Sequence, residues 1–314
     1  MEKRGVSMFP FVLIFVIIAG AVILFFFFGF SKDILRQGKT LNNLEIVNLL
    51  DRKLDSFTLA KNAINTFDMP AKPEIKINCT DEFGKKKTRI QFKEAKRDTY
   101  KLIVAPGLLK EKRLIGWTLA WEYPFKIDNF YYLANDNVIF YFQGTSGNLA
   151  NMLFNNLPQR FKKFSTINVD LNRANENVFV YYNEVDARNS RFGGNAKVIF
   201  VDNNKVVFFD RETEISEEYW GLPMLYSAIF AENGHEYKCI KNMAHKRLKA
   251  MSEIYKKKAD YLGRNNQECR YVYSQIYAHL SDNNFLDRPL DSRYNAVLVQ
   301  LNQQLNGNKC PALF

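Results

Sequence analysis

A long uncharged run near the start of the chain restricts its fold more than any other feature. No charged residue occurs from Val6 to Ser31, and Phe9 to Phe30 is almost entirely apolar. About 20 apolar residues in a helix span the hydrocarbon core of a bilayer. A secretory signal peptide has a shorter apolar stretch that ends at a small-residue cleavage site. The run therefore predicts one transmembrane helix between about Met8 and Phe30, with the lipid bilayer as partner.

The rest of the chain is long enough for one large domain and rich enough in apolar residues to bury a core. We expect an N-terminal tail and anchor at residues 1–31, a hinge and membrane-proximal helix at 32–69, and a soluble α+β domain at 70–314. Within that domain, residues 70–217 read as a mixed strand-rich region with one inserted helix. Residues 218–314 read as three to four helices. A run of strands followed by a run of helices is typical of an α+β fold.

Apolar periodicity locates the individual elements. Val47, Leu50, Leu54, Phe57 and Ile64 recur at helical spacing, which predicts a helix that ends near Phe67. That helix either packs on its own domain or forms a membrane-proximal coiled coil. Strands are expected at 74–79, 88–92, 101–105, 138–142, 166–171 and 178–182, with a hairpin at 197–209. Helices are expected at 146–161, 222–231, 239–262, 268–280 and 292–305.

The net charge of +11 is concentrated in two segments. Residues 84–113 carry eleven basic and three acidic side chains, and residues 236–270 carry ten and four. Such segments bind anionic lipid headgroups, an acidic polymer or nucleic acid, or they form a solvated surface. No nucleic-acid-binding motif accompanies them, so no specific nucleic-acid partner is expected. Other envelope proteins and a second copy of the chain are the remaining candidate partners.

The orientation rests on the cysteines, because Lys and Arg lie on both sides of the apolar run. All four cysteines follow the run, and an even number suits pairing in an oxidising compartment. Asn78 begins an Asn-Cys-Thr glycosylation acceptor pattern. We therefore expect the domain outside the cytoplasm.

No motif in the sequence predicts a catalytic residue, a cofactor or a metal. His235, Cys239, His245 and Cys269 could be drawn as a zinc site, but no closely spaced pair supports it. The acidic run of Glu212, Glu214, Glu217 and Glu218 reads as a solvated loop. An aromatic group reads as core or interface, with a ligand groove as the alternative. Its members are Trp117, Trp121, Phe130, Tyr131 and Tyr132.

Helix geometry predicts which cysteines pair. Cys239 begins a predicted helix that is roughly 35 Å long at 1.5 Å per residue. A short connection makes the next helix antiparallel, which places Cys269 near the far end of the first. A disulfide needs Cα atoms about 4.4–6.8 Å apart, so Cys310 is the better partner for Cys269 and Cys79 is left for Cys239. Four reduced, buried thiols are the alternative.

Short segments carry two family resemblances. Lys3-Arg4-Gly5 before the apolar run resembles the start of archaeal type IV pilin-like proteins, in which a peptidase cuts after the small residue. The segments Cys239–Met243, Lys246–Leu248 and Cys310–Phe314, together with Cys269, resemble single-span surface proteins of small-genome archaea. The second resemblance implies a topology and no mechanism.

These observations favour a membrane-anchored, extracytoplasmic structural or interaction protein of the cell envelope. A pilin-like filament or secretion-system subunit is one alternative. A membrane-tethered enzyme that acts on an envelope polymer is another, and a cytoplasm-facing nucleic-acid-binding domain is the most remote.

Overall fold

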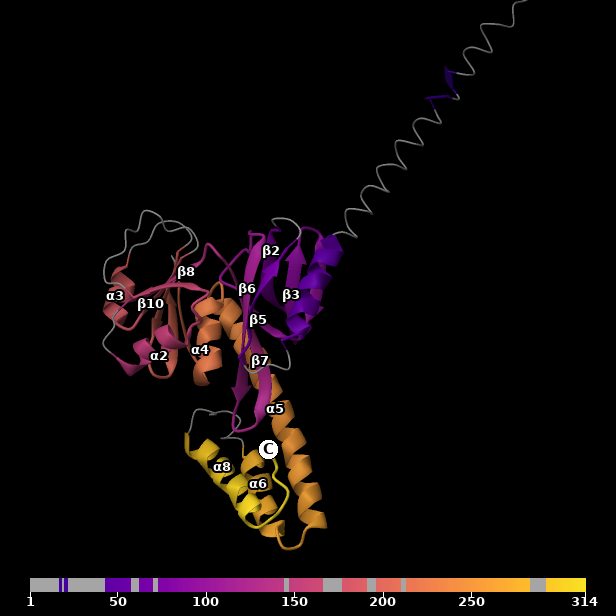
Figure 1. The fold of residues 1–314 in the computed structure, drawn as a ribbon, viewed down its shortest axis with the longest axis vertical. Coiled ribbons are helices and arrows are strands. Elements are labelled where there is room, and N and C mark those ends of the chain that lie inside the picture. Colours follow the sequence, from indigo (N-terminus) through magenta and orange to yellow (C-terminus); the bar gives the residue numbers. More distant parts are fainter. Residues whose placement is uncertain are drawn as a thin grey trace, which may run out of the picture.

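Three β-sheets and a lobe of helices make up the part of the chain that the computed structural model describes (Figure 1). The described residues are 17–18, 20–21, 43–57, 62–69, 73–143, 147–165, 177–190, 196–209, 213–282 and 292–314. The architecture is mixed α+β, as the sequence predicts.

A four-stranded sheet separates the two main cores. It consists of β1 (Ile64–Asp68), β6 (Arg113–Glu122), β7 (Lys126–Asn135) and β5 (Leu102–Val104), in that order. Neighbouring side chains of a strand point to opposite faces. Phe130 and Tyr132 of β7 therefore enter one core, while Tyr131 and Leu133 enter the other.

A three-stranded antiparallel sheet covers one face of the four-stranded sheet. Its strands are β2 (Ile75–Glu82), β3 (Lys85–Phe92) and β4 (Ala95–Thr99). The chain is helical over residues 43–55, and Val47, Leu50 and Leu54 of this helix are buried against the apolar face of the sheet. The periodic apolar residues thus pack on their own domain, as the simpler of the two helix predictions proposes.

A six-stranded sheet lies on the other side. Its order is β13 (Glu214–Glu218), β12 (Lys205–Phe209), β11 (Lys197–Val201), β10 (Asn177–Tyr181), β8 (Ile139–Gln143) and β9 (Lys162–Ser165). The four strands from β11 to β9 are parallel, and β12 and β13 are antiparallel additions. Helices α2 (Asn148–Asn156) and α3 (Glu184–Asn189) pack into separate cores of this sheet.

Helix α4 (Gly221–Phe230) is buried against the four-stranded sheet. The Tyr132 hydroxyl of β7 donates a hydrogen bond to the Pro223 carbonyl at 2.6 Å, and the Tyr226 hydroxyl donates one to the Leu153 carbonyl of α2 at 2.6 Å. These bonds satisfy phenol groups that would otherwise be buried without partners.

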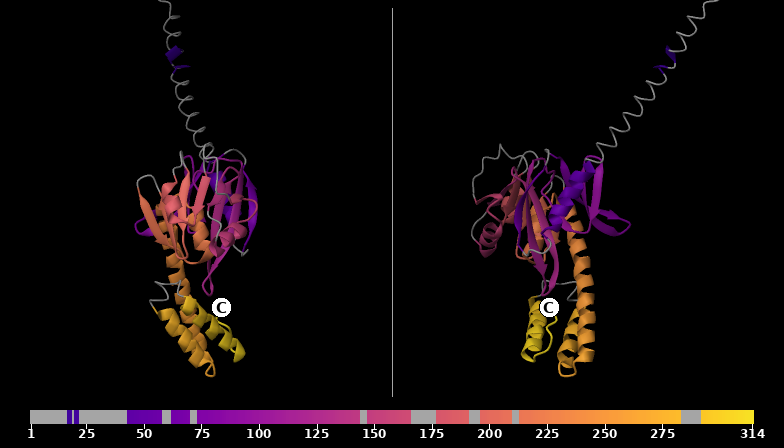
Figure 2. Two further views of the ribbon diagram at one scale, coloured as in Figure 1. Left: turned by 90° about the vertical axis from the view of Figure 1, so that its left-hand side faces the viewer. Right: turned by 45° about the vertical axis from the view of Figure 1, so that its right-hand side comes forward.

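Helix α5 (Gly234–Asn265) connects the sheets to the helical lobe, where it packs against α6 (Arg270–Ser281), which in turn packs against α8 (Ser292–Gly307). Its 32 residues extend about 48 Å, and Figure 2 shows it running alongside the sheets and continuing into the lobe. Phe125, at the end of the β6–β7 hairpin, packs against Tyr255 of α5 with ring centroids 4.3 Å apart.

The predicted membrane-spanning helix must be corrected. No helix among the described residues is long and apolar enough to cross a membrane. Most of the span predicted from Met8 to Phe30 lies outside the described residues, which include only Ile17, Ile18, Gly20 and Ala21 of it. The fold is therefore a mixed α+β arrangement of several sheets and helices, without the predicted anchor as one of its described elements.

Other predicted elements also differ from the structure. The helix expected to end near Phe67 ends at residue 55, and Ile64 and Phe67 lie in β1, because they pair with β6 instead of continuing the helical seam. The strand-rich region holds α3 as well as α2, so it has two described helices and not one. The hairpin at 197–209 and the four C-terminal helices are confirmed, whereas the strand expected at 166–171 lies outside the described residues.

Two leucines of the 43–55 helix provide a test of its docking. Leu50 is fully buried and Leu44 is 38% exposed. We expect Leu50→Ala to lower the free energy of unfolding by about 2–5 kcal/mol, because it leaves a cavity in the core. We expect Leu44→Ala to change it by less than about 0.5 kcal/mol. Urea denaturation measures both values, and equal effects would show that the helix is not docked on the sheet.

Candidate interaction surface

Two disulfides join elements that are distant in the sequence. Cys79 of β2 is bonded to Cys239 of α5, with Cα atoms 5.9 Å apart and a sequence separation of 160. Cys269, at the start of α6, is bonded to Cys310 after α8, with Cα atoms 6.4 Å apart. These are the two pairs that the sequence predicts. The first bond is partly exposed and the second is buried.

The same bonds exclude the zinc hypothesis. A zinc site needs cysteine thiolates, and both Cys239 and Cys269 are consumed in different disulfides. The His245 ring packs 5.1 Å from Trp220. Within the described ranges, no group of three or more His, Cys, Asp or Glu side chains could hold a metal ion.

The acidic run is a strand and not a loop. Glu212 lies outside the described residues, and Glu214, Glu217 and Glu218 belong to β13. Glu217 forms ion pairs with Lys241 at 2.5 Å and Lys238 at 3.2 Å, both from α5. Burial acts to raise the pKa of Glu217, but hydrogen bonds from the two lysines lower it below its usual value. The acidic run therefore helps to hold the six-stranded sheet on α5.

The aromatic group forms the interior, as the simpler of its two predictions proposes. Its members are all buried. Trp117 packs against Tyr132 and Tyr226, each with ring centroids 4.8 Å apart. Tyr131 enters the core on the other face of the sheet. These rings fill the space on both sides of the four-stranded sheet.

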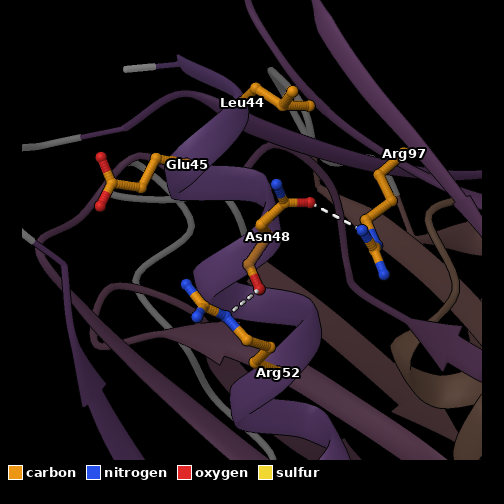
Figure 3. Close-up of a pocket in the computed structure, with 5 residues that line it drawn as sticks. All are labelled: Leu44, Glu45, Asn48, Arg52 and Arg97. Atoms are coloured by element: carbon orange, nitrogen blue, oxygen red, sulfur yellow. Dashed lines mark hydrogen bonds between the residues drawn. The ribbon is translucent and has the colours of Figure 1, made fainter. Parts of the chain in front are cut away.

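A shallow groove of about 460 Å³ lies between the 43–55 helix and β4 (Figure 3). Leu44, Glu45, Asn48, Arg52 and Arg97 line it. Arg97 donates to the Asn48 side-chain oxygen at 2.7 Å and to the Asp51 carboxylate at 2.6 Å. Lys101 also binds the carboxylate of Asp51, whose side chain is 5% exposed. Arg97 and Lys101 thus fasten the helix to the sheet through Asp51.

The two basic segments meet on one surface. Lys246 of α5 donates to the Gly84 carbonyl at 2.9 Å, and Arg247 donates to the Tyr100 carbonyl. The Cys79–Cys239 bond ties the neighbouring strand β2 to the same helix. We call this region the hairpin tip surface, because it surrounds the turn between β2 and β3. Its defining residues are Phe83, Lys85, Lys86, Lys87, Tyr100 and Lys246.

This surface was only partly predictable. The sequence shows the basic composition of residues 84–113, but the structure is needed to place the turn at Phe83–Gly84 and Lys85 to Thr88 in β3. Phe83 is fully exposed. The alternation on both sides of Phe83–Gly84 was the available signal for a hairpin, although no local pattern marks that phenylalanine as exposed.

Two further predictions concern surface residues. Asn78 lies in β2 opposite Arg89 and is partly exposed, and its glycosylation remains a prediction. The pilin-like segment Lys3-Arg4-Gly5 lies outside the described residues.

Comparison of the chain with protein-family models, with curated proteins and with solved structures finds no match. The residues and their geometry therefore carry the functional argument.

Two buried ionisable side chains, Lys197 and Glu236, lie near the N-terminal end of α5. Lys197 of β11 donates to the Ala228 carbonyl at 2.6 Å and the Ile229 carbonyl at 2.9 Å, near the C-terminal end of α4. Burial lowers the pKa of Lys197 to about 7. Glu236, in the first turn of α5, accepts a hydrogen bond from the Glu232 amide at 2.7 Å, and burial raises its pKa to about 8.

These two groups predict a pH-dependent stability. The raised pKa of Glu236 means that its contribution to the free energy of unfolding is complete below pH 4.5 and is lost as the pH rises toward 8. The lowered pKa of Lys197 makes the free energy of unfolding rise with pH, but only above about pH 7. Between about pH 5 and 7, wild-type Tm should therefore fall relative to that of Glu236→Gln, because a tenfold difference in proton affinity between the folded and unfolded chain corresponds to about 1.4 kcal/mol.

Thermal unfolding across this pH range measures the difference. Glu253→Gln replaces an exposed carboxylate of the same helix and should leave the pH profile of wild type unchanged. Parallel Tm profiles for wild type and Glu236→Gln would contradict the assignment of Glu236.

Proposed function

We propose that the chain is an extracytoplasmic structural or interaction protein of the cell envelope. The supporting observation is that the chain contains four cysteines and that all of them are paired in two disulfides. Disulfides form and persist in secreted, periplasmic and surface proteins, whereas cytosolic thiols are kept reduced. Both bonds close sequence separations of more than forty residues, which suits a structural role.

The distribution of charges supports binding as the activity. Three buried or partly buried carboxylates, Asp51, Asp128 and Glu217, form ion pairs with Arg97, Arg247 and Lys241 respectively. These pairs dock one element on another. The hairpin tip surface, in contrast, presents the exposed side chains of Lys85 and Lys246 and two exposed aromatic rings to solvent, which is the composition of a contact site.

Thiol trapping in cells tests the proposed compartment. Cells are treated with an alkylating reagent at the moment of lysis, and the chain is digested without reductant. We expect linked peptides that contain Cys79–Cys239 and Cys269–Cys310, and no alkylated cysteine. Four alkylated thiols would contradict an oxidising location.

Two controls make the result specific. Cys310→Ser should leave Cys269 alkylated while Cys79–Cys239 stays linked, which shows that the reagent reaches a free thiol. A second control is needed because the cytosol of hyperthermophiles also contains disulfides. Protease added to intact cells should degrade the domain if it lies outside the cytoplasm. A domain that is protected until lysis would place it inside the cell even if both disulfides form.

A further inference from the structure

The turn between β2 and β3 holds an unexpected residue. Phe83 and Gly84 connect the two strands with φ values of 53° and 74°. A two-residue hairpin with positive φ at both positions favours Asn-Gly or Asp-Gly, and a bulky residue in this left-handed region is an outlier. Backbone preference therefore does not explain a phenylalanine at position 83.

Burial does not explain it either. The Phe83 side chain is fully exposed, and a Cβ added at Gly84 would have no atom within 4 Å. The turn thus projects into solvent and offers no wall against which the ring could pack. A residue that is unfavourable for both conformation and solvation points to a partner that covers it.

Cations lie close to the turn that carries this ring. Lys85, Lys86 and Lys87 follow the turn directly, and Lys246 is held at the turn by its bond to the Gly84 carbonyl. The nearest acidic side chains are partly neutralised within the hairpin, because Asp81 pairs with Lys86 at 3.7 Å and Glu82 pairs with Arg89. The surface near Phe83 is therefore positive.

A second exposed ring lies beside these lysines. Tyr100 is 59% exposed, and the Lys87 ammonium lies 5.8 Å from the centre of its ring. Arg247 holds the Tyr100 carbonyl and is itself paired with Asp128. Exposed aromatic rings accompanied by lysines are typical of surfaces where proteins meet the headgroup layer of a bilayer.

We propose that the hairpin tip surface binds the anionic face of a lipid bilayer, with the Phe83 ring inserted among the headgroups and Lys85, Lys87 and Lys246 close to their phosphates. The inference rests on the proposed envelope location. A ring that projects into solvent from a turn suits a fluid surface that closes around it, whereas a folded protein partner would need a matching pocket. Basic residues near an anionic leaflet add electrostatic attraction.

Tryptophan fluorescence at the tip tests this proposal in the full chain. The three native tryptophans are at most 7% exposed, so Phe83→Trp adds the solvent-exposed indole. Vesicles of phosphatidylglycerol and phosphatidylcholine in equal parts should shift the emission of this variant to the blue, and brominated acyl chains should quench it. Vesicles of phosphatidylcholine alone should have much less effect.

The matched control is Tyr261→Trp on α5. Tyr261 is 68% exposed and lies fifteen residues beyond Lys246, about 22 Å along the helix. Its indole should be quenched several-fold less than the indole at position 83. Equal quenching at both positions, or no shift at position 83, would overturn the proposal even if other parts of the chain hold it on the vesicles.

Two more variants separate binding from folding. Adding Lys85→Gln and Lys87→Gln to Phe83→Trp should weaken the apparent affinity for anionic vesicles by about thirtyfold. Phe83→Asn fits the turn better, so its Tm should equal or exceed that of wild type. A lower Tm would assign Phe83 a structural role and overturn the proposal.

The outcomes also separate this inference from the proposed function. If both disulfides form in cells while the indole at position 83 stays in water, the envelope location stands and the lipid contact is wrong. A blue shift caused only by an acidic protein would likewise refute the lipid assignment.

Discussion

Burial of the four-stranded sheet on both faces is the constraint on which the other elements depend. One face of β6 and β7 packs against α4 and the neighbouring large core, and the other packs against the 43–55 helix and the three-stranded sheet. Each added layer depends on the four-stranded sheet, because a single sheet or helix must cover its apolar face with another element. The sheet also contacts α5, which leads into the helical lobe, because Phe125 of the β6–β7 turn packs against Tyr255. The four-stranded sheet therefore provides the surface on which the two main cores are built.

This arrangement explains which elements could be predicted from the sequence. The hairpin of β11 and β12 has turn residues at its tip, and α5, α6 and α8 each show one apolar face, so local patterns located them. Strands β6 and β7 escaped prediction because residues buried on both faces lose the alternation that marks a strand. The sequence of β1 predicts a helix because Ile64 and Phe67 continue a helical spacing, and only pairing with β6 decides their structure.

The candidate site likewise contains features that the sequence predicts and features that it does not. Helix lengths and short connections constrained the disulfide pairs, because few geometries bring cysteine Cα atoms close enough to bond. The basic segments were visible as composition, but their meeting depends on how α5 packs across β2 and β3. The exposure of Phe83 depends on the backbone conformation of one turn, which no periodic pattern records.

The two disulfides also define how tension would travel through the chain. A pull applied between the 43–55 helix and Phe314 passes from Cys79 directly to Cys239, along most of α5, and from Cys269 directly to Cys310. The intervening loops, which contain β3 through α4 in one case and α6 and α8 in the other, carry no covalent load. Extension of the oxidised protein would therefore be limited to the segments outside these loops. The greater part of the fold would remain mechanically shielded while its two ends were drawn apart.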